Sequence, residues 1–264
     1  MLDLFRRRAL ARSSMASGLA GFWPGQCTFC RCWCRGALCE DCEALHPVDA
    51  GPRCARCALR LPAGTRATDA AMRCGRCASH PMPLSRCVAG MDYLFPWDRL
   101  LLGLKFGERL EHAPLLAARL SRALELARVE PPDLIMPVPL SAQRLRERGY
   151  NQAHEIARRL ILPAERQSPS QVQVQVQVQV QRQSRLCALT LMRVRHTDQQ
   201  AQLPLDERRG NLRGAFAVVK PVHGLRVAIV DDVMTSGATL HEAALALRRA
   251  GARDVQAWVV ARTP

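Results

Sequence analysis

The chain has 264 residues, of which 48% are hydrophobic, and a formal net charge of +15. This length suits one large domain or two smaller ones, and no run of about 18 apolar residues is present, so we expect no membrane span. The charge favours a polyanion such as nucleic acid as a partner. All but two of the 38 basic residues are arginine, however, and such usage can also follow a GC-rich genome.

Four zones follow one another along the chain. Residues 1–26 are predicted to be a flexible tail, because Arg12 and several serines interrupt the hydrophobic core that a signal peptide needs. Residues 27–87 are rich in cysteine, arginine and glycine, and poor in large apolar side chains. Residues 88–264 are predicted to form an α/β domain that carries a low-complexity insert at 167–184.

Eight of the 12 cysteines form Cys-x-x-Cys pairs. Such pairs favour metal binding in a reducing compartment, so we expect a cytoplasmic protein. Two pairs complete a tetrahedral shell of sulfurs at about 2.3 Å from the metal, which suits a structural Zn²⁺. Cys32 and Cys34 could replace Cys30 or Cys39. The predicted ligands are Cys27, Cys30, Cys39 and Cys42 for one ion, and Cys54, Cys57, Cys74 and Cys77 for the other.

Helical and strand patterns alternate through the rest of the chain. Apolar spacing predicts a helix that begins near Pro114 and continues to Ala127. Asn151 can cap a second helix, which Pro163 stops, and a third helix is predicted at Thr239–Ala250. This alternation predicts a parallel α/β sheet. Its strands are predicted at Leu134–Val138, Leu186–Val194, Ala215–Val219, Arg226–Val230 and Val255–Val260.

The insert contains five consecutive Gln-Val pairs from Gln171 to Val180. A repeat this uniform specifies no strand register, because every slip of two residues is equivalent. We expect a disordered surface loop without a function of its own and with some tendency to β-aggregation.

Two adjacent acids follow the predicted strand Arg226–Val230. Ligands of open α/β sheets lie beyond the carboxyl ends of the strands. Ionised carboxylates accept hydrogen bonds from ribose hydroxyls and can help to hold a hydrated Mg²⁺. The next residues open a helix, where N–H groups and hydroxyls suit a phosphate. The alternative, a polar turn with an ordinary cap, leaves this order of residues unexplained. The predicted pocket consists of Asp231, Asp232, Thr235, Ser236, Gly237, Ala238 and Thr239.

This segment resembles the ribose-5-phosphate motif of the type I phosphoribosyltransferases. Other motifs are similar to those of the ComF family (competence protein F, also called GntX-like), and the resemblance extends over residues 27–264 apart from the insert. These motifs are Leu104-Lys-Phe106, Pro137-Val-Pro-Leu140, Arg144 to Gln152, Arg195-x-Thr197-x-x-Gln200 and Glu207 to Phe216.

The resemblance implies a type I phosphoribosyltransferase-like core with a small N-terminal double zinc ribbon. It implies 5-phosphoribosyl 1-diphosphate (PRPP) with Mg²⁺ as the ligand, Asp231 and Asp232 as catalytic acids that position the ribose, and residues 235–239 as the 5-phosphate loop. Arg144, Arg148 and Asn151 would bind pyrophosphate, although the arginines could also form a solvated helix face. A mobile lid would extend from about Arg193 to Gly210. Several relatives use a catalytic lysine there, whereas this stretch contains arginines but no lysine.

The implied function is that of a phosphoribosyltransferase-like protein with a role in DNA uptake and natural transformation, beside single-stranded DNA and competence proteins. In the alternative, the pocket binds its ligand without turnover, and the protein is an adaptor or regulator that contacts partners or DNA through its zinc ribbons. A zinc-ribbon transcription regulator would explain the cysteines but not the acidic pair. No residue of the sequence identifies an acceptor substrate.

Overall fold

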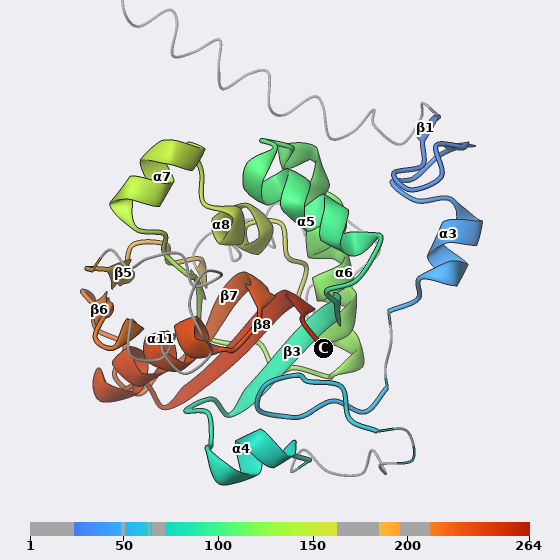
Figure 1. Ribbon diagram of the computed structural model, residues 1–264. Helices are drawn as coiled ribbons and strands as arrows, with labels where there is room; N and C mark the ends of the chain where they lie inside the picture. The colour runs from blue at the N-terminus through green and yellow to red at the C-terminus, as the bar shows by residue number, and fades with distance from the viewer. Residues whose placement is uncertain (1–23, 49–50, 63, 65–71, 163–184, 196–211) are drawn as a thin grey trace, which may run out of the picture. The chain divides into compact units, whose positions relative to one another are not determined.

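The computed structural model describes residues 24–48, 51–62, 64, 72–162, 185–195 and 212–264 (Figure 1). The predicted tail up to residue 23, the Gln-Val insert and residues 196–210 of the predicted lid lie outside the described residues. The chain forms two compact units, Met1–Pro47 and Val48–Pro264. The sequence places a boundary after residue 87, whereas the second group of cysteines belongs to the same compact unit as the α/β sheet.

The N-terminal unit has little regular structure among its described residues. Strand β1 (Gly25–Gln26) pairs antiparallel with β2 (Trp33–Cys34), and helix α3 (Glu40–Leu45) follows. The sulfur of Cys39 caps α3, because it accepts a hydrogen bond from the backbone N–H of Cys42 at 3.4 Å. This unit therefore combines short elements with cysteines at their ends.

The second unit is built on a four-stranded parallel sheet, which confirms the predicted fold class. The strand order is β3 (Arg86–Asp92), β8 (Asp254–Arg262), β7 (Arg226–Met234) and β4 (Leu134–Pro137), and every neighbouring pair is parallel. The apolar residues from Val227 to Val230 of β7 are fully buried, as a central parallel strand requires.

Helices pack on both faces of this sheet (Figure 1). α6 (Ala113–Leu126) contacts β3 and α8 (Gln152–Ala157), and α8 contacts β7. Helix α11 (Ala238–Arg249) shares a hydrophobic core with Val227 and Ile229 of β7. The remaining helices are α4 (Gly75–Ser79), α5 (Trp97–Phe106), the 3-10 helix η1 (Leu110–His112) and α7 (Ala142–Arg148). Among the described residues, we find no helix with the length and hydrophobicity that a bilayer crossing requires.

Two of the predicted strands lie elsewhere than expected. Only Leu191–Arg193 of the predicted strand 186–194 is extended as β5, and it pairs antiparallel with β6 (Phe216–Val218) in a separate two-stranded sheet. Leu186 makes a single bridge to Ile135 at the edge of β4, and a turn follows. The prediction of one long strand was wrong because its two ends pair with different partners.

Candidate functional site

Asp231 and Asp232 lie in the second half of β7 and are 9% and 3% exposed. Successive side chains of a strand point to opposite faces of the sheet. Since Ile229 packs in the core that contains α11, Asp231 faces that same side. Asp232 faces the other side, where Nζ of Lys105 on α5 lies 2.9 Å from its Oδ2. The two adjacent acids therefore face different surroundings.

Asp231 lines a pocket together with the loop that follows β7. The other lining residues include Thr235, Gly237, Ala238 and Thr239, and the empty volume is about 240 Å³ with open solvent included. The first N–H groups of a helix have no partner within the helix, and they suit an anion. The structure thus brings one predicted acid together with the predicted phosphate loop.

The middle of this loop has little freedom. Ser236 is buried, and its Oγ accepts a hydrogen bond from the N–H of Ala238 at 3.4 Å. Gly237 has a φ of +77° and immediately precedes α11. A Cβ at Gly237 would lie 2.4 Å from Cε of Met234. The left-handed backbone conformation therefore favours glycine here, and a larger residue would also have to displace the end of the Met234 side chain.

The acidic pair carries opposite pKa shifts. Burial, followed by the negative charge of Asp232, raises the pKa of Asp231 well above its ordinary value. Burial alone would also raise the pKa of Asp232, but the ammonium of Lys105 lowers it below the ordinary value. Asp232 raises the pKa of Lys105 in turn, against the opposing effect of burial. A bound cation or diol beside Asp231 would stabilise its ionised form, so this carboxylate fits a hydrated Mg²⁺ or a ribose.

Further basic side chains surround the pair. Burial lowers the pKa of Arg148, and the charge of Asp232 opposes this shift. Burial together with the charge of Arg144 lowers the pKa of Arg193 to about 10, which Asp231 opposes. Arg148 also donates to Oε1 of Gln152 at 2.5 Å. The predicted pyrophosphate ligands Arg144 and Arg148 therefore share an electrostatic environment with the acidic pair.

The side chain of Asn151, the third predicted pyrophosphate ligand, forms hydrogen bonds with backbone groups. Its side-chain oxygen accepts hydrogen bonds from the N–H groups of Ala153 and His154, which caps α8 as predicted. Its Nδ2 donates to the carbonyl of Val138 at 3.0 Å. Both ends of the carboxamide thus hold the loop after β4, and a role in pyrophosphate binding stays a prediction.

Lys105 and Arg193 interact with the acidic pair, although the sequence analysis gave neither a role in binding. Lys105 lies in the motif Leu104-Lys-Phe106 and Arg193 begins the predicted lid, so both stood in segments that the resemblance had singled out. The hydroxyl of Tyr150 donates to the carbonyl of Leu104, which ties the end of α5 to the loop before α8. The ion pair joins Lys105 to Asp232, more than 120 positions later in the chain. Local sequence patterns do not predict contacts between residues so far apart.

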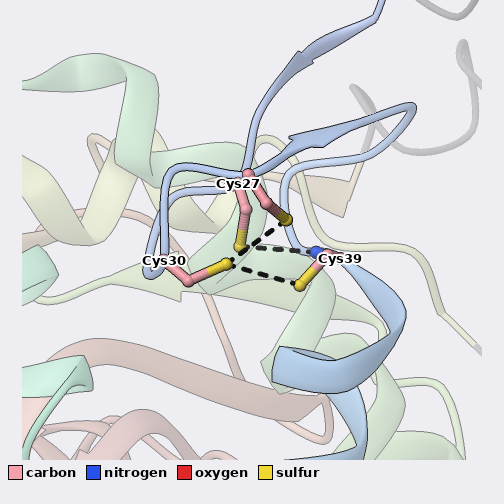
Figure 2. A group of neighbouring side chains, drawn as sticks. Cys27, Cys30 and Cys39 are labelled. Atoms are coloured by element: carbon pink, nitrogen blue, oxygen red, sulfur yellow. Dashed lines mark hydrogen bonds between the residues drawn. The ribbon is translucent and has the colours of Figure 1, made fainter.

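The cysteines of the N-terminal unit converge on one point. The thiols of Cys27, Cys30, Cys32 and Cys39 all lie within 4.8 Å of one another, and Figure 2 shows the sulfurs of Cys27, Cys30 and Cys39 turned toward each other. The sulfur of Cys30 lies 3.3 Å from that of Cys32 and 3.6 Å from that of Cys39. This set contains Cys32 where the sequence predicted Cys42, so it differs in one member.

Cys42 nevertheless belongs to the same cluster. Burial and hydrogen bonds to the thiols of Cys39, Cys30 and Cys27 raise its pKa. Four thiolates complete a zinc shell, and five thiols are in place. The assignment of Cys42 as a ligand therefore stays a prediction beside Cys32.

The second cluster contains the predicted set. The thiols of Cys54, Cys57, Cys74 and Cys77 lie within 4.8 Å of one another and are all buried. Sulfurs around a tetrahedral zinc are about 3.8 Å apart when each bond is about 2.3 Å, and those of Cys57 and Cys74 are 3.6 Å apart. This second tetrad fits a structural Zn²⁺.

Comparison with known proteins places the chain in a family. A model of the phosphoribosyl transferase domain matches residues 143–264. The chain is 34% identical to the DNA utilization protein YhgH of Salmonella typhimurium over 91% of its own length and 98% of that protein. It is 31% identical to Competence protein F of Haemophilus influenzae, over 64% of this chain and 69% of that protein. It is also 28% identical to Competence protein ComFC of Bacillus subtilis, over 49% and 45%. The chain therefore belongs to the ComF family of phosphoribosyltransferase-like proteins.

Proposed function

We propose that this protein binds PRPP together with Mg²⁺ in the pocket between Asp231 and the loop 235–239. The carrying observation is that a buried carboxylate and the start of α11 line the same cavity. The carboxylate accepts hydrogen bonds from vicinal ribose hydroxyls, and the helix start binds the 5-phosphate. Asp231 would hold the hydrated Mg²⁺, which neutralises charge on the diphosphate.

The basic side chains near the acidic pair are candidates to bind the diphosphate of PRPP. Lys105 forms an ion pair with Asp232, Arg148 interacts electrostatically with Asp232, and Arg193 does so with Asp231. Guanidinium groups bind diphosphate oxygens in a bidentate manner. The diphosphate of PRPP would therefore lie toward these cations, with its ribose over Asp231.

The reaction that fits this arrangement is phosphoribosyl transfer. An acceptor would attack C1 of the ribose, and the bond from C1 to the diphosphate oxygen would break, with both electrons leaving on pyrophosphate. The cations stabilise the departing negative charge. The acceptor's proton would pass to solvent, since Asp231 is the only acid or base among the described residues that line the pocket.

Calorimetric titration with PRPP, with and without Mg²⁺, tests this function. We expect saturable binding that depends on Mg²⁺ and is abolished in Asp231→Asn. Glu125→Gln serves as the control, because Glu125 lies on α6, where its carboxylate forms an ion pair with Arg122. Absence of saturable binding to the wild-type protein in the presence of Mg²⁺ would overturn the proposal.

A second candidate function, handling of single-stranded DNA, rests on the aromatic residues at the two ends of α5. Phe95 and Phe106 are 72% and 70% exposed. The guanidinium carbon of Arg99 lies 5.7 Å from the ring of Phe95, and that of Arg148 lies 5.4 Å from the ring of Phe106. Exposed rings beside cations suit stacked bases, and the net charge of +15 suits the backbone. The relative named DNA utilization protein YhgH supports a role with DNA.

Anisotropy of a labelled oligo-dT tests this candidate. Stacking contributes at least about 1 kcal/mol per base, so Phe95→Ala with Phe106→Ala should weaken binding at least about fivefold. Leu189→Ala, which removes another exposed apolar side chain, should leave the affinity unchanged. Equal affinities of all three proteins would exclude α5 as the binding surface.

A further inference from the structure

The second cysteine tetrad is connected to the phosphate loop by Arg76. Arg76 lies between Cys74 and Cys77 in α4, and its Nη2 donates a hydrogen bond to the carbonyl of Ser236 at 2.9 Å. The two residues are 160 positions apart in the chain. Arg76, which lies between two cysteines of the tetrad in the sequence, therefore holds the centre of the loop.

Arg262 makes a second connection. It is 6% exposed, and its Nε donates to the carbonyl of Cys57 at 3.0 Å. Its Nη1 donates to the carbonyl of Met234 at 3.1 Å. One buried guanidinium thus binds the first half of the tetrad and the last residue of β7, where the loop begins.

Apolar packing accompanies these hydrogen bonds. All four cysteines of the tetrad lie in one hydrophobic core with Met82, Met234 and Ala238. The space beside Gly237 is closed by the methyl groups of Met234 and Met82, and Sγ of Cys87 lies 3.8 Å from Sδ of Met234. The loop therefore rests on the tetrad and on the chain that leads from it to β3.

A tetrahedral metal would lock the backbone on which these contacts depend. The tetrad fits Zn²⁺ by its buried thiols and short separations, as described above. Its four bonds would fix the carbonyl of Cys57 and the α4 turn that carries Arg76 relative to each other. The segments around the two cysteine pairs are already linked by a hydrogen bond from the N–H of Ala55 to the carbonyl of Met72 at 2.8 Å, and a metal would add four bonds to this link.

We propose that the second tetrad, through Arg76 and Arg262, holds the phosphate loop in the conformation that accepts the ligand. Arg76 is a positioning residue, since it touches the loop carbonyl and not the pocket side of the loop. This proposal rests on the proposed function for its ligand-binding consequence. The part of the proposal that concerns the conformation of the loop does not depend on any ligand.

The test compares Arg76→Ala with Arg73→Ala, a matched removal of an exposed arginine that precedes Cys74. The readouts are zinc content, amide hydrogen exchange of residues 235–240 without ligand, and PRPP affinity. We expect Arg76→Ala to keep its zinc, to exchange several-fold faster across 235–240, and to bind PRPP about tenfold more weakly, because a hydrogen bond from a charged donor is lost. Arg76→Lys should restore part of the protection. Arg73→Ala should match the wild type.

A metal arm completes the experiment. Cys77→Ser should lose one zinc and show the same faster exchange across 235–240 as Arg76→Ala. Equal exchange of Arg76→Ala and Arg73→Ala would overturn the inference. Should the wild-type protein fail to bind PRPP, the proposed function fails, and the exchange readout still decides whether the tetrad holds the loop. Cys77→Ser with normal loop exchange and one zinc fewer would also overturn the proposal.

Discussion

Nζ of Lys105 lies 2.9 Å from Oδ2 of Asp232, and this pair joins the end of α5 to the middle of the sheet. The carboxylate side chain is 5% exposed and the lysine side chain 27%. A buried charge is costly unless it is paired, so Lys105 stabilises Asp232 in its ionised form. The ammonium has further hydrogens with which to bind an incoming diphosphate.

Lys105→Met should weaken PRPP binding at least about tenfold, because one charge-assisted hydrogen bond and the counter-ion of Asp232 are lost together. Lys220→Met is a matched control, since Lys220 is the only other lysine and is exposed. Titration calorimetry with Mg²⁺ measures both affinities. Identical affinities of the two variants would remove Lys105 from the site.

Gly237→Ala should lose PRPP binding, whereas Gly224→Ala should keep it. Both glycines have a positive φ, of +77° and +76°, so each variant should lose about 1–2 kcal/mol of stability. Only at Gly237 would the new Cβ meet another atom, Cε of Met234 at 2.4 Å, so the Met234 side chain, which also lines the pocket, would have to move. Thermal unfolding and calorimetry separate these effects. Retained binding by Gly237→Ala would show that the loop tolerates displacement.

The two cysteine clusters should differ in what they stabilise. Cys54→Ser should lose one zinc per chain, and so should the double variant Cys30→Ser with Cys32→Ser, which leaves three thiols in the N-terminal cluster; elemental analysis measures both. Only Cys54→Ser should lower the unfolding temperature of the α/β unit, because Cys54 lies in the hydrophobic core of that unit and Cys30 belongs to the N-terminal unit. An unchanged unfolding temperature of Cys54→Ser would contradict this.

Asp92→Asn should destabilise the α/β unit by about 1–3 kcal/mol at pH 7. Asp92 at the end of β3 accepts hydrogen bonds from Arg53 at 2.7 Å and Arg60 at 2.5 Å. Burial alone would raise its pKa, but these two arginines lower it. A lowered pKa in the folded state gives stability that is present above the unfolded value of about 3.9 and is lost as the pH falls through the folded value.

Urea unfolding of wild-type protein and Asp92→Asn at several pH values checks this sign. The difference in the free energy of unfolding should stay constant from about pH 7 to pH 5 and shrink only below about pH 3.9. Asp98→Asn, whose carboxylate only accepts from the N–H of Arg99, should show a smaller difference. A decline that is already complete at pH 5 would contradict a lowered pKa.

The central parts of the fold could be predicted because their signals are local. The continuous apolar run at Arg226–Val230 indicates a buried parallel strand, and β7 begins at this residue. The strand continues through Asp231 and Asp232 to Met234, because β8 supplies backbone partners as far as Arg262. Carboxylates are rare in strands, so residue patterns alone did not predict that the strand continues through them.

The contacts that shape the site could not be predicted in the same way. The pair of Lys105 with Asp232 and that of Arg76 with Ser236 depend on the packing of distant elements. The prediction of one strand at residues 186–194 was wrong for a related reason, because strand propensity does not determine which segment a strand pairs with. Residue order thus predicted that Asp231 and the loop after β7 lie together, whereas it did not predict the contacts that support the loop.

The alternation of side chains along β7 has a consequence for how this family can diverge. The neighbouring aspartates point to opposite faces of the sheet. The charges of Asp232 and Lys105 nevertheless both act on the pKa of Asp231. A substitution of Lys105 on α5 would therefore change the protonation of both acids, so the charge on one face of the sheet and ligand binding on the other are expected to change together.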